Sequence, residues 1–228
     1  MSSLLHIETS TDICSVAVSG EGECVYNREG HGGHSEILGT FIDEAFAFVE
    51  AQGMAISAVA VSSGPGSYTG LRIGVSMAKG ICYGLGVPLI AVSTLELLCV
   101  PLLLRDQPIE DDALLCPMID ARRMEVYAGI YDKALRTVRD VRADIVDETT
   151  YREYLAERPV YFFGNGALKC REKISHPNAR FIEGAEPLAK WMFPLAEKKI
   201  REGKTEDVAY FVPHYLKEFV AGKPKPII

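Results

Sequence analysis

One stretch of the sequence, residues 55–85, restricts the fold of this chain more than any other. It starts with an apolar run at 56–61, turns through glycine and hydroxyl residues, and continues as a helical segment at 70–85. Such a loop leaves backbone N–H groups free at a helix N-terminus, where the helix dipole favours an anion. Glycine loops are also common as plain connections, so the stretch predicts either a phosphate cradle or a purely structural turn.

The residues of the loop suit both roles. Gly64 and Gly66 can adopt a positive φ and let another group approach the backbone. Thr69 is expected to cap the helix that follows. No lysine followed by serine or threonine comes after the last glycine, so the Walker pattern is absent.

Charge is divided unevenly along the chain. Residues 1–108 carry four basic and eleven acidic side chains, whereas residues 109–228 carry twenty of each. Phosphate contacts need clustered lysine and arginine, so the acidic first half argues against nucleic acid wrapping around it. The second half has local basic residues at Arg136, Arg139 and Arg142. We interpret these first as a solvated charged face and only second as a nucleic-acid contact.

The cysteines and the hydropathy pattern indicate the compartment. None of the six cysteines forms a C-x-x-C pair, and most lie in apolar runs, as small buried side chains do. The chain starts without the basic and apolar regions of a signal peptide, and its apolar stretches are too short to span a membrane. These features predict a cytoplasmic protein with reduced thiols and no membrane contact.

The first thirty residues read as an antiparallel meander of three short strands, at 4–8, 13–19 and 23–29. Glu8 ends the first strand beside Thr9 and Ser10. A carboxylate placed there could orient a hydrated metal on a nucleotide phosphate. The alternative, which we favour, is a carboxylate satisfied by the amides of the turn.

A weak internal repeat begins at residue 114. Residues 114–120 again read as a strand ending in an acid, Asp120, and 124–131 and 134–143 read as its partners. Two copies of a meander followed by helix, strand and helix predict a duplicated α/β architecture with a cleft between the halves. We expect a first lobe at 1–106, a smaller second lobe at 107–207, a helix near 208–219 packing back on the first lobe, and a flexible tail at 220–228.

Two histidines and a wide apolar helix stand between the first meander and the glycine loop. His31 and His34 are three residues apart, but the next histidine is His176, so we expect no closed metal site. Ser35 is expected to cap a helix at 36–51. The apolar arc of this helix is wider than one core-facing stripe needs, which indicates either a partner surface or a deeply set helix.

Five runs of residues resemble the TsaB family, formerly called YeaZ. They are HIETST, HSEILG, VSSGPGSYTGLRIGVSMAKG, VPLIAVSTLELL and IDARRMEVYAGIY, and they cover most of the first ~130 residues. GNGALK and VPHYLKEF add weaker support. The resemblance implies the ASKHA fold of actin, Hsp70 and sugar kinases, which agrees with the duplicated meander.

The resemblance also implies a function and partners. It implies a non-catalytic scaffold of the complex that makes N6-threonylcarbamoyladenosine next to the anticodon of tRNA. TsaD would be the catalytic partner and TsaE a third component. A homodimer would use the same surface when the chain is alone, and contact with tRNA would be at most indirect. The implied interface lies on the helices at 36–51 and 70–85 and comprises Leu38, Phe41, Ile42, Ala45, Leu71, Val75, Ala78, Lys79 and Cys82.

The chain departs from the family pattern at several positions. Glu8 stands where aspartate is usual, Tyr68 where phenylalanine is frequent, and Lys217 where arginine is common. We therefore expect no catalytic residue, no metal and no cofactor of its own, with at most weak ATP or ADP binding in a vestigial cleft. That cleft would be formed by Glu8, Thr9, Gly64, Gly66, Ser67, Asp120, Gly164, Asn165 and Gly166.

Enzyme activity is the competing hypothesis. The chain could be a nucleotide-dependent transferase or ATPase of the ASKHA class, with Glu8 or Asp120 holding the metal. An older family label suggests a glycoprotease-like metallopeptidase, but the sequence shows neither a metal set nor a nucleophile–base pair. A third possibility is that Arg136 and Arg139 help to hold tRNA.

Overall fold

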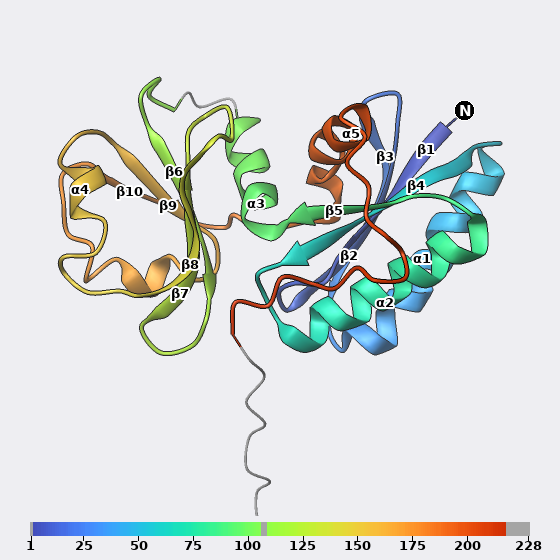
Figure 1. The fold of residues 1–228 in the computed structure, drawn as a ribbon, viewed down its shortest axis with the longest axis horizontal. Helices are drawn as coiled ribbons and strands as arrows, with labels where there is room; N and C mark the ends of the chain where they lie inside the picture. The colour runs from blue at the N-terminus through green and yellow to red at the C-terminus, as the bar shows by residue number, and fades with distance from the viewer. Residues whose placement is uncertain (1, 106–108, 218–228) are drawn as a thin grey trace, which may run out of the picture.

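The computed structural model describes residues 2–105 and 109–217, which fold into two lobes around two five-stranded sheets (Figure 1). The strand order is β3-β2-β1-β4-β5 in the first sheet and β10-β9-β6-β7-β8 in the second. In reverse, the second order is β8-β7-β6-β9-β10. Strands β8, β7 and β6 then correspond to β3, β2 and β1, and β9 and β10 correspond to β4 and β5. The predicted duplicated α/β fold with two mixed sheets is therefore confirmed.

The first sheet contains the first meander and the apolar strand before the glycine loop. Its strands are β1 (Ser2–Glu8), β2 (Ile13–Gly20), β3 (Glu23–His31), β4 (Ala55–Gly64) and β5 (Leu89–Ser93). The three meander strands pair antiparallel, whereas β1, β4 and β5 run parallel. The carboxyl ends of β1, β4 and β5 consequently lie at one edge, where Glu8 and Gly64 sit.

Helices α1 (His34–Ala51) and α2 (Tyr68–Leu85) cover one face of this sheet (Figure 1). Apolar and small side chains three or four residues apart on each helix are buried against alternate residues of the strands. The resulting core includes Leu5, Ile7 and Val16 from the sheet, Leu38 and Ile42 from α1, and Val75, Ala78 and Cys82 from α2.

Helix α3 (Thr94–Leu103) lies between the two sheets and joins the lobes (Figure 1). Leu97 and Val100 pack on the first sheet, and Leu95 and Leu98 pack on the second. This explains why the segment is apolar on all sides. Ser93 caps it by accepting a hydrogen bond from the Glu96 amide at 3.4 Å.

The second lobe is built on the repeated meander. Its elements are β6 (Leu114–Asp120), β7 (Glu125–Tyr131), β8 (Thr137–Ile145), α4 (Arg152–Leu155), β9 (Val160–Phe163), η1 (Leu168–Cys170) and β10 (Ala179–Ile182). The meander pairs antiparallel, and β9 runs parallel to both β6 and β10. Helix α4 is a single turn of four residues.

The chain returns to the first lobe earlier than the predicted boundary at residue 207. The short helix η2 (Ala189–Trp191) and helix α5 (Phe193–Arg201) pack on the first sheet, where Met192 and Leu195 contact Ile90 and Val92 in one cluster. Helix α5 lies on the face of the sheet opposite α1 and α2 (Figure 1). The predicted boundary therefore placed this segment in the wrong lobe, because the lobe to which a segment belongs depends on which sheet its apolar face covers.

The helix predicted near 208–219 does not form within the described residues. Residues 206–217 run as an irregular segment, the C-terminal strap, from β5 along α2 (Figure 1). Glu206 bridges Leu89, Lys79 Nζ donates to the carbonyl oxygens of Ala209 and Phe211 at 2.9 and 3.2 Å, and the His214 amide donates to Ser63 O at 2.7 Å. Pro213 and the absence of helical spacing suit this extended path. The tail predicted at 220–228 lies outside the described residues.

Candidate functional site

The glycines at the start of α2 form a seat for the turn between β1 and β2. A Cβ added at Gly66 would collide with Ser10, and one added at Gly70 or Gly74 would collide with Thr9. Thr9 Oγ1 donates to the Gly70 carbonyl at 2.8 Å. The small residues at 66, 70 and 74 are therefore required because the chain's own turn approaches the loop and helix backbone closely.

Hydrogen bonds inside the protein occupy several donors at this helix N-terminus. The Ser67 amide donates to Ser10 O at 2.7 Å, the Gly70 amide to Ser67 Oγ at 3.2 Å, and the Leu71 amide to Ser67 O at 2.9 Å. Ser67, and not Thr69 as predicted, is the N-cap. The bonds of Ser67 and Gly70 withdraw two amides that a phosphate group would need free.

Glu8 is fully buried at the end of β1. Its Oε1 accepts a hydrogen bond from the Ser10 amide at 2.5 Å, as expected for a carboxylate satisfied by its turn. Burial raises the pKa of Glu8 to about 7, and contacts from Ser10, Ser62 and Thr9 offset only part of that rise. An enclosed carboxyl group that holds its proton near neutral pH is a poor ligand for a hydrated cation.

Buried polar atoms surround Glu8 on the sheet face that looks toward α3 and η2. Within residues 2–105 and 109–217, Glu8 Oε2, Ser10 Oγ, Ser62 Oγ and Thr94 Oγ1 have no hydrogen-bond partner. Ser15 Oγ, opposite Glu8 in the pairing of β1 with β2, accepts the Ala189 amide at 2.9 Å. The segment that returns to the first lobe thus closes over this polar row.

The second lobe repeats the arrangement at the matching place. Gly164 and Gly166 follow β9 as Gly64 and Gly66 follow β4, and a Cβ on either would press on the backbone of β6 at Met118 or Ile119. Asn165 Oδ1 accepts the Asp120 amide at 2.9 Å, and Asp120 forms an ion pair with Lys169. The second glycine loop therefore also packs on the end of a strand.

The structure separates the expected cleft residues rather than converging them on a ligand. Glu8 and Thr9 are buried in the first lobe. Asp120 and Asn165 are exposed in the second lobe, where Asn165 Oδ1 accepts a hydrogen bond from the Asp120 amide. In the glycine loop, the amides of Ser67 and Gly70 are engaged and the space beside Gly66 is filled by Ser10. The vestigial nucleotide cleft stays a prediction.

The two histidines considered as a metal pair have different roles. His34 Nε2 is 2.7 Å from Thr11 O and so ties α1 to the β1–β2 turn, while the exposed His31 lies 3.6 Å from Asp12. Ser35 does not cap α1, because Gly33 occupies the N-cap position without a side-chain bond. Within residues 2–105 and 109–217, no group of three or more histidine, cysteine or acidic side chains is placed to hold a metal ion.

Comparison with known proteins decides the family. The family model of TsaD, tRNA N6-adenosine threonylcarbamoyltransferase, matches residues 25–225. The chain belongs to this family. Curated relatives named tRNA threonylcarbamoyladenosine biosynthesis protein TsaB come from Haemophilus influenzae and Escherichia coli. They are 27% and 29% identical, over 98% of this chain and 97% and 98% of theirs.

Other relatives agree with the TsaB resemblance. A TsaB from Bacillus subtilis is 40% identical over 52% of this chain and 51% of its own length. YeaZ from Pseudomonas aeruginosa is 27% identical, with a TM-score of 0.80 over 95% of this chain and all of that one. The predicted membership of the TsaB (YeaZ) group is thereby confirmed, as is a place in tRNA threonylcarbamoyladenosine biosynthesis.

Most of the interface residues expected for a TsaB protein are inside the chain. Seven of the nine are buried in the first lobe, namely Leu38, Ile42, Ala45, Leu71, Val75, Ala78 and Cys82. Phe41 lies over Gly30 of β3, where an added Cβ would be 3.2 Å from its Cζ, and Lys79 holds the C-terminal strap. Buried side chains cannot meet a partner, so these seven residues do not form a partner surface. Phe41 and Lys79 are only partly buried, and their place in an interface stays a prediction.

A different set of side chains lies along the junction of α1 and α2. One side of α2 carries an apolar residue every four positions, at Ile73, Met77 and Ile81. The same side carries Gly70, and a Cβ added there would contact the His34 ring of α1. Phe46 is half-buried on α1, and Asp43 and Glu50 are exposed near it. We call Phe46, Ile73, Met77 and Ile81 the α1–α2 ridge. The spacing of four residues is visible in the sequence, but only burial in the folded chain shows which stripe of side chains stays partly exposed.

The arginines considered for tRNA in this TsaB protein are engaged elsewhere. Arg139 is buried and bonded to Asp144 at 2.6 Å and to Ala128 O at 3.2 Å. Arg136 pairs with Asp132 at 2.6 Å in the turn before β8. The expectation that Arg139 contacts tRNA is therefore wrong, because its guanidinium is inside the second lobe.

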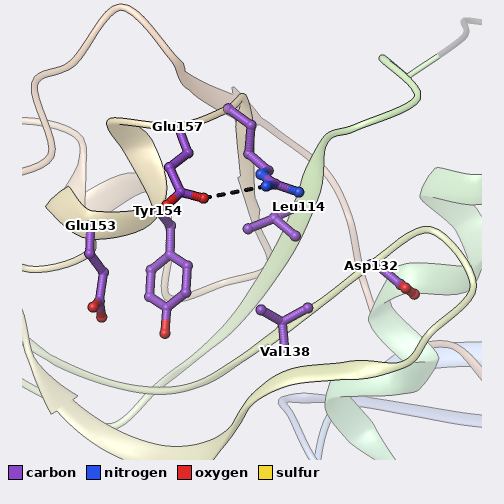
Figure 2. Close-up of a pocket in the computed structure, with 7 residues that line it drawn as sticks. Leu114, Asp132, Val138, Glu153, Tyr154 and Glu157 are labelled. Atoms are coloured by element: carbon purple, nitrogen blue, oxygen red, sulfur yellow. Dashed lines mark hydrogen bonds and ion pairs between the residues drawn. The ribbon is translucent and has the colours of Figure 1, made fainter.

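Two surface pockets lie away from the glycine loop. A hollow of about 310 Å³ beside α4 is lined by Leu114, Asp132, Val138, Glu153, Tyr154, Glu157 and Arg158 (Figure 2). In it, Arg158 donates to Glu157 at 3.3 Å. The other, of about 290 Å³, lies between the start of β1 and α5. None of the described helices is long and apolar enough to cross a membrane.

Proposed function

We propose that this chain is a non-catalytic scaffold subunit of the complex that forms N6-threonylcarbamoyladenosine next to the anticodon of tRNA. Its full-length similarity to TsaB proteins supports the pathway. The observation that carries the scaffold role is the seat at Gly66, Gly70 and Gly74, which the chain fills with its own β1–β2 turn. A loop whose Ser67 and Gly70 amides bond inside the protein has fewer donors for a substrate phosphate.

The partner in this proposal is TsaD, with TsaE as a third component. TsaD carries the transferase name, and a TsaD from Geotalea uraniireducens is 32% identical over 41% of this chain. Binding to this chain would activate TsaD. The subunit would work in the cytoplasm without a cofactor of its own, and the engaged amides of the glycine loop argue against even weak ATP or ADP binding.

The α1–α2 ridge is the proposed contact for TsaD, and for a second copy of this chain when TsaD is absent. Its half-buried apolar side chains remain partly exposed after the first lobe has folded. Covering them would contribute to an interface on the order of 1,200–2,000 Å² in total. Asp43 and Glu50 beside Phe46 would favour a partner with basic residues around an apolar centre.

The test is reconstitution with the TsaD of the same organism. The two chains should co-elute as a stable complex, and transfer of the threonylcarbamoyl group to a tRNA transcript should depend on adding this chain. Transfer that is equally fast without it, or failure of the two to associate, would contradict the proposal. ATP hydrolysis by the isolated chain that is abolished in Glu8→Ala would favour the enzyme hypothesis instead.

A further inference from the structure

The turn between β6 and β7 displays two arginines at a conformational cost. Arg122 and Arg123 have φ values of 72° and 52°, in the left-handed region that asparagine and glycine favour. For other residues this region costs roughly 1–2 kcal/mol each. Both side chains are exposed, and within residues 2–105 and 109–217 neither guanidinium has an ion-pair partner. Strain retained at an exposed turn points to a use for these side chains.

Two lysines beside the turn neutralise the nearby carboxylates. Lys169, on η1, forms an ion pair with Asp120 and donates to Glu125 O at 2.7 Å. Lys217, in the C-terminal strap, forms an ion pair with the Glu125 side chain. The positive charges of Arg122 and Arg123 are therefore left uncompensated at this end of the second lobe.

The positive surface continues onto the first lobe through the C-terminal strap. The strap leaves α2 and ends beside β7, between the lobes (Figure 1). Tyr215, two residues before Lys217, packs on Tyr68 with ring centroids 4.8 Å apart, and Arg72 Cζ lies 5.5 Å from the Tyr68 ring. Arg72, Tyr68 and Tyr215 thus join the first lobe to the cations of the second.

Electrostatic effects on two tyrosines support this continuity. Burial raises the pKa of Tyr127, and Lys217 and Arg122 both act against that rise. Burial likewise raises the pKa of Tyr215, and Arg72 acts against it. Lys217 and Arg122 therefore lie near Tyr127, and Arg72 lies near Tyr215, in agreement with the Lys217–Glu125 ion pair and the Tyr68–Tyr215 contact.

We propose that this basic strip, formed by Arg72, Arg122, Arg123, Lys169 and Lys217, binds the phosphate backbone of an RNA strand. Guanidinium groups bind phosphate oxygens bidentately, and the Tyr68–Tyr215 pair offers an aromatic edge for a base. The aromatic pair between cations favours RNA over an acidic protein. The inference rests on the proposed function, under which the RNA is the tRNA substrate, and it replaces the expected indirect contact with a direct one.

The test compares two double variants of the full chain. Arg122→Ala with Arg123→Ala removes the exposed charges of the strip. Lys198→Ala with Arg201→Ala removes the same charge from exposed positions of α5, at the opposite end of the first lobe (Figure 1). Binding of an in vitro tRNA transcript is measured over a range of salt concentrations, for each chain alone and in complex with TsaD.

We expect the strip variant to bind the transcript about tenfold more weakly. The slope of log affinity against log salt should become shallower by about 1.4, since each single-strand phosphate contact contributes about 0.7. The α5 variant should match the wild type. Equal affinity and slope for all three chains would overturn the inference, as would a strip variant that loses TsaD but not RNA, because the strip would then be a protein contact. If TsaD binds none of the chains, the proposed function fails, and the chains alone decide whether the strip binds RNA.

Discussion

The Ser67 amide donates a hydrogen bond to the carbonyl oxygen of Ser10 at 2.7 Å, joining the glycine loop to the turn that follows β1. Thr9 and His34 complete the same junction through bonds to Gly70 O and Thr11 O. Three separate sequence motifs, at residues 6–11, 34–39 and 61–80, therefore meet at one place. Their shared role is to lock the first strand, α1 and α2 together.

Gly74→Ala should destabilise the protein by about 1–3 kcal/mol, because the added methyl group meets Thr9 Oγ1 and Cγ2. Thr9→Ala in the same chain should recover part of this loss, since it removes both of those atoms. Urea unfolding followed by circular dichroism measures each difference.

Gly80→Ala, in the same helix, is the matched control. An added Cβ at Gly80 meets nothing within 4 Å, so this variant should be more stable than the wild type by up to about 1 kcal/mol. If both alanine variants change stability equally, close packing on Thr9 is not the reason for the glycine row.

Glu8→Gln should remove one component of the pH dependence of stability. The pKa of Glu8 is about 7 when folded and 4.5 in its ordinary range, so the folded state binds the proton more tightly. The stabilisation is fully present below about pH 4.5 and is lost as pH rises through 7. Relative to the glutamine variant, the wild type should lose on the order of 3 kcal/mol between pH 4.5 and pH 8.

The comparison with Glu8→Gln is needed because His6 acts in the opposite direction. Burial lowers the pKa of His6 to about 3, so its contribution to stability falls as the pH drops below 6.5. Unfolding in urea should be measured at several pH values for both chains. A difference between them that is constant from pH 5 to pH 8 would contradict a raised pKa of Glu8.

Met77→Asp should prevent association with TsaD, and with a second copy, while leaving the chain folded. Met77 is half-buried on the α1–α2 ridge, where a new charge would face the partner. Ser76→Asp adds the same charge at an exposed neighbouring position and should associate normally. Gel filtration and capture by tagged TsaD measure the effect, and equal capture of both variants would exclude the ridge as the contact.

Arg139→Ala should cost about 1.5–3 kcal/mol of stability, because it removes the buried one of the two arginines that pair with Asp144. Arg142 Nε at 3.1 Å and the Tyr151 hydroxyl at 2.6 Å remain on that carboxylate. Arg136→Ala breaks an exposed pair with Asp132 and should cost at most about 1 kcal/mol. Urea midpoints of the two variants give the comparison. Neither change should alter the affinity for tRNA, and a selective loss of tRNA binding by folded Arg136→Ala would return that residue to the RNA-binding surface.

Local patterns predicted the elements well because they depend on neighbours in sequence. Alternating apolar residues indicated β1, β2, β6 and β7, and the acids that end β1 and β6 revealed the repeat. The cap of α2 was assigned to Thr69 instead of Ser67, because hydroxyl residues that are two apart offer equivalent local signals.

The sequence by itself determined the repeated strand order, the family and the place of the glycine loop, since these depend on periodicity and on motifs. Only the tertiary structure decided what the loop contacts, because its amides and the space beside its glycines could have gone to a ligand or to Ser10 and Thr9. It also decided that Val75 and Arg139 are buried while Met77, Arg122 and Arg123 stay accessible. Residue type shows which groups can bind; burial against the rest of the chain decides which remain available.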